Sequence, residues 1–140
     1  MKISVILAVF NGEAYLDRSI NSFLEQDYTN KELIIVDGKS TDNSHKIIAK
    51  FQKKYPKIIK WIKEKDSGIS DARNIAIKNA SGDLIGNLGV DDVLCKDLFK
   101  QLEYYDAQNP YYDVIYFDSQ LISKEASYVK RSSHIPVNYR

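Results

Sequence analysis

The stretch Asp83-Leu84-Ile85-Gly86-Asn87-Leu88-Gly89-Val90-Asp91-Asp92 joins a short apolar strand to two adjacent carboxylates. A strand that leaves the core and stops at paired aspartates is well placed to hold a divalent cation. Mg²⁺ and Mn²⁺ prefer hard oxygen ligands, and Mg²⁺ often shares its site between carboxylates and substrate phosphates. The same pair could instead begin the next helix, because Asp is a favoured N-cap residue. The rest of the chain decides between these two interpretations.

Strands and helices alternate on both sides of this stretch. Continuous apolar runs predict strands at 3–10, 32–37, 58–64 and 83–92. Apolar residues at helical spacing predict helices at 13–26, 42–55, 69–80 and 96–106. This alternation predicts an α/β fold with a doubly wound, mainly parallel sheet and helices on both faces. A strand at 113–118 and a weakly alternating segment at 120–131 are expected at an edge of the sheet.

Acidic residues follow the predicted strands. Asp37 ends the second strand, Asp66 follows the third, and Asp91 and Asp92 end the fourth. The carboxyl ends of parallel strands meet at one edge of a sheet, which is where ligands bind in this class of fold. Carboxylates gathered there repel each other unless a cation or a hydrogen-bonding ligand lies among them. Their position therefore favours the cation interpretation.

Composition excludes several classes of protein. A length of 140 residues is that of one domain, and a net charge of +1 gives no reason to expect a nucleic-acid partner. The single Cys95 excludes an internal disulfide and a cysteine-built zinc site, which fits a reducing compartment. The apolar run at 3–10 is too short for a transmembrane helix.

Missing motifs narrow the chemistry further. The chain has no Gly-x-Gly-x-x-Gly after the first strand, no P-loop and no Gly-x-Ser-x-Gly elbow, so a dinucleotide oxidoreductase, a P-loop NTPase and an α/β-hydrolase are poor fits. His45 falls on the polar side of a predicted helix, and His134 in a polar tail is a weak candidate for a ligand or a base. What remains is a metal held by carboxylates that would stabilise negative charge on a leaving diphosphate.

Five stretches in order resemble the N-terminal half of the family 2 glycosyltransferases, which have the GT-A fold. The matching residues are Ile3 to Asn11, Glu32 to Asp42, Glu64 to Asn74, Ala80 to Asp83, and Val90 to Asp92. The resemblance implies that the end of the first strand and the aspartate of the second hold the nucleotide base, which makes Val9, Asn11 and Asp37 candidates. It also implies that Asp91 meets the ribose or sugar and that Asp92 holds the metal, with Asp91 as a second candidate ligand.

The resemblance places four more residues at the donor pocket, namely Asp66, Gly68, Asp71 and Arg73. Arg73 suits a pyrophosphate because its planar fork pairs with phosphate oxygens. An ordinary surface salt bridge with Asp71 is the alternative for this residue. The loop Ser40-Thr41-Asp42 is expected to do no more than cap a helix.

The implied activity is glycosyl transfer, of the inverting type, from a UDP-sugar to a glycan or lipid-linked acceptor in bacterial cell-surface polysaccharide synthesis, with Mg²⁺ or Mn²⁺. The resemblance also implies one GT-A domain over residues 1–140, truncated before the acceptor-binding half, so no residue here is assigned as general base. The expected location is the cytoplasm or the inner face of the membrane, and a homo-oligomer is left open. Two alternatives are kept: a nucleotide-sugar-binding module without turnover, and a nucleotidyltransferase. The second is a poor match, because Asn11-Gly12-Glu13 is not a glycine-rich basic loop.

Overall fold

The computed structural model describes residues 1–64, 67–108, 114, 115 and 117. The chain divides into two compact units, Met1–Tyr104 and Tyr105–Arg140. The first unit holds the sheet and the candidate site. In the second unit, the described residues are the last turn of a helix and three residues without regular secondary structure, Val114, Ile115 and Phe117. No helix within the described ranges is long and apolar enough to span a bilayer.

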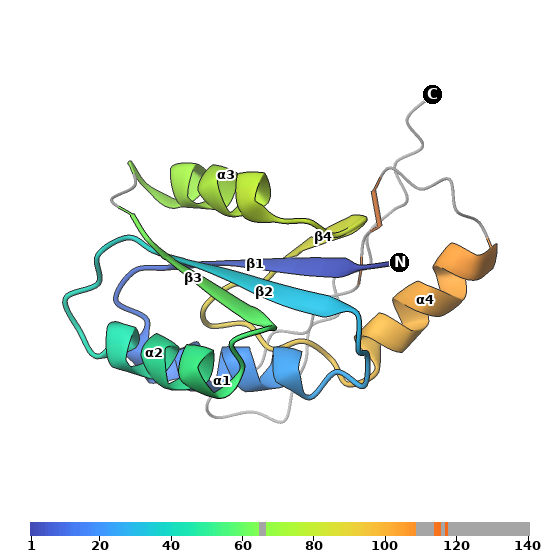
Figure 1. Cartoon of the computed structure of the whole chain (residues 1–140), viewed down its shortest axis with the longest axis horizontal. Helices are drawn as coiled ribbons and strands as arrows, with labels where there is room; N and C mark the ends of the chain where they lie inside the picture. Colours follow the sequence, from blue (N-terminus) through green and yellow to red (C-terminus); the bar gives the residue numbers. More distant parts are fainter. Residues whose placement is uncertain (65–66, 109–113, 116, 118–140) are drawn as a thin grey trace. The chain divides into compact units, whose positions relative to one another are not determined.

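A four-stranded parallel sheet forms the centre of the first unit (Figure 1), with the strand order β3-β2-β1-β4. Ile3, the first residue of β1, pairs with Lys31 at the start of β2 and with Leu84 at the start of β4. The strands therefore start together at one edge of the sheet, and their carboxyl ends point to the opposite edge, which we call the carboxyl edge. The strands are β1 (Ile3–Val9), β2 (Lys31–Asp37), β3 (Ile59–Lys63) and β4 (Leu84–Asn87). The predicted parallel α/β sheet is confirmed.

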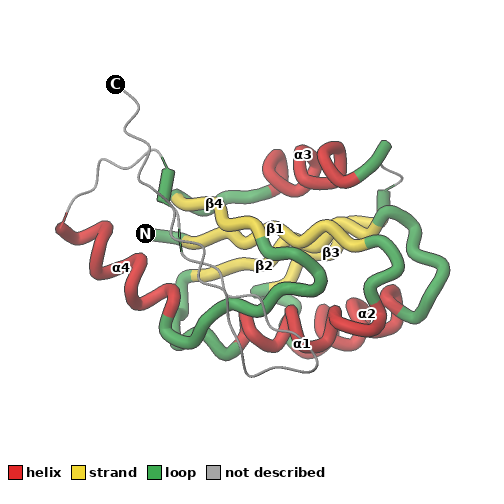
Figure 2. The backbone as a smooth tube through the Cα atoms, turned by 180° about the vertical axis from the view of Figure 1, so that it is seen from behind, coloured by secondary structure: helices red, strands yellow, loops and turns green. Residues whose placement is uncertain are grey.

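Helices cover both faces of this sheet, as predicted. Helices α1 (Glu13–Leu24) and α2 (Ser44–Lys54) lie side by side on one face, and α3 (Ile69–Asn79) lies on the other (Figures 1 and 2). Helix α4 (Leu98–Gln108) follows β4 and begins against the C-terminal end of α1, where Phe99 meets the ring of Phe23 edge-to-face. The chain therefore winds in both directions from β1.

The most buried strands are central. From Leu33 to Asp37 every residue of β2 is buried, which is the pattern of a strand covered on both faces. On the α3 face, Ala72 and Ala76 pack against Ile34 and neighbouring strand residues, as the helical spacing predicts. The helical spacing at 13–26 also predicts that Tyr15 belongs to the apolar face of α1. This prediction is wrong: the Tyr15 side chain is 47% exposed, because it lies beside the apolar stripe rather than in it.

The strand before the paired aspartates is shorter than predicted. β4 ends at Asn87, four residues before Asp91, and half of its residues are exposed. Leu88 N–H still donates to the Ile6 carbonyl, but the chain then leaves the sheet in a turn closed by the bond from Asp92 N–H to Gly89 O. The two carboxylates therefore lie on a loop at the strand's end. The strand expected at 113–118 is not found at its three described residues, and the segment 120–131 and His134 lie outside the described part of the chain.

The edge opposite the strand ends is fixed by Glu32. Its carboxylate accepts hydrogen bonds from Ser4 Oγ at 2.5 Å, Lys2 Nζ at 2.9 Å and Ser81 N–H at 2.7 Å. Next to it, a Cβ at Gly82 would lie 2.6 Å from Ser4 Oγ, so only glycine fits. The start of the matching stretch Glu32 to Asp42 thus meets the stretch Ala80 to Asp83 far from the carboxyl ends of the strands. These contacts stabilise the fold.

We expect this cluster to make stability depend on acid pH. Burial works to raise the pKa of Glu32, but the bonds from Ser4, Lys2 and Ser81 outweigh it and lower the pKa from 4.5 to about 2. A lowered carboxyl pKa stabilises the fold above the unfolded value, and that contribution is lost as the pH falls from about 4.5 to 2. Urea unfolding at several pH values should therefore show a loss of about 1–2 kcal/mol in this window that Glu32→Gln lacks.

The matched control for this experiment is Glu103→Gln, which removes an exposed carboxylate from α4 with the same change of charge. It should keep the acid slope of the original chain. Equal slopes for the original chain and Glu32→Gln would contradict the assignment.

Candidate donor site

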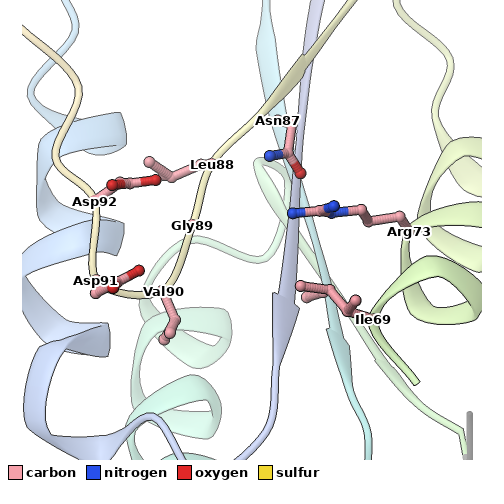
Figure 3. Close-up of a pocket in the computed structure, with 9 residues that line it drawn as sticks. Ile69, Arg73, Asn87, Leu88, Gly89, Val90, Asp91 and Asp92 are labelled. Carbon is pink, nitrogen blue, oxygen red and sulfur yellow. The ribbon is translucent and has the colours of Figure 1, made fainter. Parts of the chain in front are cut away.

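A cavity of about 210 Å³ opens at the carboxyl edge of the sheet, between α3 and the loop after β4 (Figure 3). It brings together three of the predicted site residues, Arg73, Asp91 and Asp92. Figure 3 shows the Arg73 side chain extending from α3 toward Asn87, with Asp91 and Asp92 across the cavity. The other lining residues are Ala8, Ile69, Asn87, Leu88, Gly89 and Val90. The cavity thus combines one guanidinium with two carboxylates.

Arg73 forms no ion pair with another described residue. Its Nε is buried and makes no hydrogen bond within the described part of the chain. The alternative of a salt bridge with Asp71 is wrong, because Asp71 Oδ2 instead accepts the N–H of Ser67 at 2.9 Å and the ion pairs found among described residues do not include Arg73. A buried donor without an acceptor costs about 1–3 kcal/mol, so this arginine is poised for an external anion.

The loop that carries the carboxylates folds back tightly on itself. Both Asp91 and Asp92 are exposed, and a Cβ at Gly89 would collide with Asp92 Oδ2. A Cβ at Gly12 would likewise collide with Val90 Cγ2, so the turn after β1 also has to be glycine for this loop to approach it. The two glycines therefore set where the carboxylates lie.

Two serines of α1 and Gln26, which follows the end of that helix, hold this loop, and the sequence reasoning missed them. Ser19, Ser22 and Gln26 are almost fully buried. Ser19 Oγ donates to the Gly89 carbonyl at 3.1 Å, and Ser22 Oγ accepts the N–H of Leu94 at 3.1 Å. The Gln26 side chain donates to Cys95 O at 2.9 Å and accepts the N–H of Phe99 at 3.2 Å. Their spacing of three and four residues, beside the apolar stripe of α1, is the signal that could have found them.

Replacing Gln26 should loosen the loop. Gln26→Leu leaves the Cys95 carbonyl and the Phe99 amide without their partner, and each unsatisfied buried group costs about 1–3 kcal/mol. We expect a lower unfolding temperature in calorimetry. Gln101→Leu, which changes an exposed glutamine of α4, is the control and should leave the transition in place. Equal transitions for both variants would show that the bonds to Gln26 do not hold the segment.

Asp37 lies in a second cavity at the same edge. This cavity has a volume of about 290 Å³ and is lined by Asp37, Lys39, Ser40, His45 and Lys63. Asp37 is only 3% exposed, and its Oδ1 accepts the Ser40 N–H at 2.9 Å. Lys39 has φ 64°, a left-handed conformation that is strained for a residue other than glycine. The structure therefore puts Asp37 at the predicted edge, on the β2–β3 side of it, in a cavity separate from that of Arg73.

The loops after β1 and β2 are bonded to each other. Asn11 Oδ1 accepts the Thr41 N–H at 2.8 Å, and Asn11 N–H donates to Ser40 Oγ at 2.9 Å. Asp42 accepts the N–H groups of Glu13 and Ser44 with its two oxygens. The prediction that Ser40-Thr41-Asp42 only caps a helix is therefore too narrow, because these residues also join α1 to α2.

Four other predicted site residues, Val9, Asn11, Gly68 and Asp71, do not line either cavity. Val9 is buried, and its carbonyl accepts the N–H of Gly38. The side-chain oxygen of Asn11 is used by Thr41. Gly68, with φ 121°, precedes the first turn of α3, and Asp71 closes that turn. Asp66 lies outside the described residues. The nucleotide-binding roles of these residues stay predictions.

The donor set fits a divalent cation that is shared with a ligand. No group of three potential metal-ligating side chains occurs within the described ranges, so the protein offers the two carboxylates of Asp91 and Asp92 and leaves other positions to phosphate oxygens or water. The missing side chain of Gly89 lets the Asp92 carboxylate lie close to the loop backbone, on the side of Asp91. Both observations suit Mg²⁺ or Mn²⁺.

A parallel α/β sheet with this site at its carboxyl edge is the fold of the GT-A glycosyltransferases. Residues 1–349 of TarS from Staphylococcus aureus superpose with a TM-score of 0.70 at 28% identity, over 79% of this chain and 33% of that one. A mannosyltransferase of Pyrobaculum calidifontis shares the fold with a TM-score of 0.64, over 69% of this chain and 29% of that one, at 22% identity.

The sequence comparison identifies the family. The model of glycosyl transferase family 2 matches residues 4–137, and the chain belongs to that family. An uncharacterized glycosyltransferase of Nostoc sp., alr2836, is 42% identical over 93 residues, which is 66% of this chain and 29% of the relative. The poly(ribitol-phosphate) beta-N-acetylglucosaminyltransferase TarS of S. aureus is 32% identical over 102 residues, 71% of this chain and 18% of the relative. The chain thus spans less than a third of the length of either protein.

Proposed function

We propose that this chain binds the nucleotide-sugar donor of a family 2 glycosyltransferase, with a UDP-sugar as the ligand and a divalent cation at Asp92 and Asp91. The observation that carries the proposal is the cavity in which Arg73, whose buried Nε has no hydrogen-bond partner among the described residues, faces the two carboxylates. A diphosphate joined to a cation matches both the guanidinium and the carboxylates of this cavity. Its oxygens can accept hydrogen bonds from the guanidinium and can also complete the coordination of the metal.

Relatives support the choice of donor. A TarS structure similar to this chain, with a TM-score of 0.68 at 28% identity, was solved in complex with UDP-GlcNAc. The minor teichoic acid biosynthesis protein GgaB of Bacillus subtilis is 34% identical over 115 residues. We therefore place the reaction in cell-surface polysaccharide synthesis, with a glycan or lipid-linked acceptor.

The residues of this chain act in the mechanism chiefly by binding and orientation. When bound, the cation neutralises charge that develops on the diphosphate as the sugar leaves. Arg73 would hold the diphosphate oxygens by charge-assisted hydrogen bonds that strengthen as that charge grows. Ser19, Ser22 and Gln26 keep the carboxylate loop in place. The proton of the acceptor hydroxyl requires a general base, and none is assigned in the described residues.

A nucleotide-sugar-binding module without turnover is the second candidate, favoured by the short span of this chain relative to its relatives. Family membership speaks against the nucleotidyltransferase alternative.

Calorimetric titration of UDP in the presence of Mn²⁺ tests donor binding, and the same titration with EDTA tests the metal. Metal-dependent binding is expected, and its absence would refute the proposal. Release of free sugar from a UDP-sugar, followed by chromatography, separates an enzyme from a binding module.

A further inference from the structure

The positive charge of this chain is concentrated in one segment. Residues 39–64 contain eight lysines, no arginine and two carboxylates, which gives a net +6. Because the whole chain has a formal net charge of +1, the remaining residues carry a net −5. The segment comprises α2, β3 and the loops next to them, so the charge lies on neighbouring elements at one side of the sheet (Figure 1). Most of this positive charge lies outside the two cavities, because only Lys39 and Lys63 of the eight lysines line the second cavity and none lines the first.

A stripe of lysines runs along the exposed side of α2. Lys46, Lys50 and Lys53 are spaced four and three residues apart, so they share one helix face, opposite the buried Ile48 and Phe51. All three are exposed, and among described residues none of them forms an ion pair. Lys46 Nζ bonds only the neutral side chain of Asn43, at 2.8 Å. We call these three residues, with Lys57 in the following turn, the α2 lysine stripe.

Local structure gives a reason for only one lysine of this stripe: Lys53 lies in the last turn of α2, where the helix dipole favours a cation. Like charges three or four residues apart on a helix destabilise it slightly. Lys46 lies in the first turn, where the helix dipole disfavours a cation. The stripe therefore works against the stability of α2, and an external anionic partner would remove that repulsion.

The shape and chemistry of the stripe select the kind of partner. It lies on the exposed side of a helix, and none of its lysines lines either of the two cavities described above. Lysine is a mobile point charge, whereas specific phosphate recognition favours the planar fork of arginine, and the segment contains no arginine. The aromatic rings nearby lie under lysines instead of projecting, since Lys54 Nζ is 5.2 Å from the Tyr55 ring centroid and Lys63 Nζ is 3.9 Å from that of Trp61. These features suit a broad, mobile, anionic surface that the protein contacts without inserting side chains into it.

We propose that the α2 lysine stripe docks the protein on the anionic headgroups of a lipid bilayer. The contact is electrostatic and reversible, and it weakens as salt is added. Helix α3, which carries Arg73, lies on the opposite face of the sheet from α2 (Figure 1), so docking through α2 leaves that helix uncovered. The surface is independent of donor binding, and either proposal can fail without the other.

Sedimentation with lipid vesicles tests the proposal. The chain of 140 residues is mixed with vesicles that contain phosphatidylglycerol, and with vesicles of phosphatidylcholine alone. We expect binding to the first kind only, with loss at high salt. The triple variant Lys46→Gln/Lys50→Gln/Lys53→Gln should weaken partitioning by at least about tenfold, because each lysine near an anionic surface contributes several-fold.

The matched control is Arg18→Gln/Lys78→Gln/Lys96→Gln, which removes the same charge from exposed positions on other elements. It should bind vesicles much more tightly than the stripe variant, and circular dichroism checks that both remain folded. Equal weakening by both variants would show that only net charge matters and would overturn the proposal. Binding to soluble polyphosphate that matches or exceeds binding to vesicles would also overturn it, in favour of a soluble polyanion.

Discussion

Asp92→Asn should abolish the metal-dependent part of UDP binding, with a loss of affinity of roughly 100-fold or more in the presence of Mn²⁺. The change replaces a carboxylate by a neutral amide of the same shape, in a loop held by α1 and by the turn to Gly89. Two adjacent carboxylates repel each other, so removing one should leave the unfolding temperature unchanged or raise it slightly. Calorimetric titration with Mn²⁺ and with EDTA, together with a thermal melt, measures both effects.

Asp97→Asn is the matched control for this experiment. Asp97 is exposed on the same segment, lies outside both cavities and has φ 64°, a conformation that asparagine also tolerates. Its UDP affinity should equal that of the original chain. If Asp92→Asn binds UDP with unchanged affinity and unchanged metal dependence, the two carboxylates are not the metal site, and only their part in the turn after β4 would remain.

Arg73→Met should weaken UDP binding by roughly 10- to 100-fold while the protein stays at least as stable. The affinity falls because a charge-assisted hydrogen bond to phosphate is lost. Stability is kept because the buried Nε, which has no acceptor among the described residues, no longer has to be desolvated. The measurements are UDP titration and urea unfolding of the same preparation.

Two further substitutions sharpen the test. Arg73→Lys keeps the charge but loses the planar fork, so it should recover only part of the affinity. Lys78→Met removes an exposed cation from the same helix and should change neither quantity. A marked fall in stability for Arg73→Met with unchanged UDP affinity would make this arginine a structural residue and would remove the main support for the donor site.

The fold could be predicted largely from local patterns. The continuous apolar run from Leu33 to Val36 predicted a strand covered on both faces, and the structure confirms it because all four residues are buried. The small residues Ala72 and Ala76 likewise indicated the inner side of α3. The predicted end of β4 was wrong, because the apolar residues Leu88 and Val90 continue the strand pattern. The turn that ends the strand depends on the bond from Asp92 N–H to Gly89 O, which forms after the chain has left the sheet. Tyr15 was misplaced because its position beside the apolar stripe depends on packing.

The site was predictable only where its chemistry is visible in residue type. Arg73, Asp91 and Asp92 were predicted, and the structure brings them into one cavity. Only the structure shows that Arg73 does not pair with Asp71. The sequence is compatible both with an ion pair between them and with an Arg73 side chain that has no partner among the described residues. The support from Ser19, Ser22 and Gln26 was missed because polar residues on a helix are ordinarily solvated, whereas here they bond backbone about 70 positions away.

The pairing of β4 with β1 has a consequence for the order of folding. Lys2 N–H donates to Asp83 across 81 positions, whereas Ser4 and Glu32 of the β1–β2 pair are 28 apart. Closing the longer loop costs about 1 kcal/mol more in chain entropy, and on the ribosome β4 emerges after the paired strands β1 and β2. The sheet's first three strands and α3 can thus assemble before the carboxylate loop exists. The cavity of the proposed donor site is therefore completed at a late step, when β4 docks beside β1.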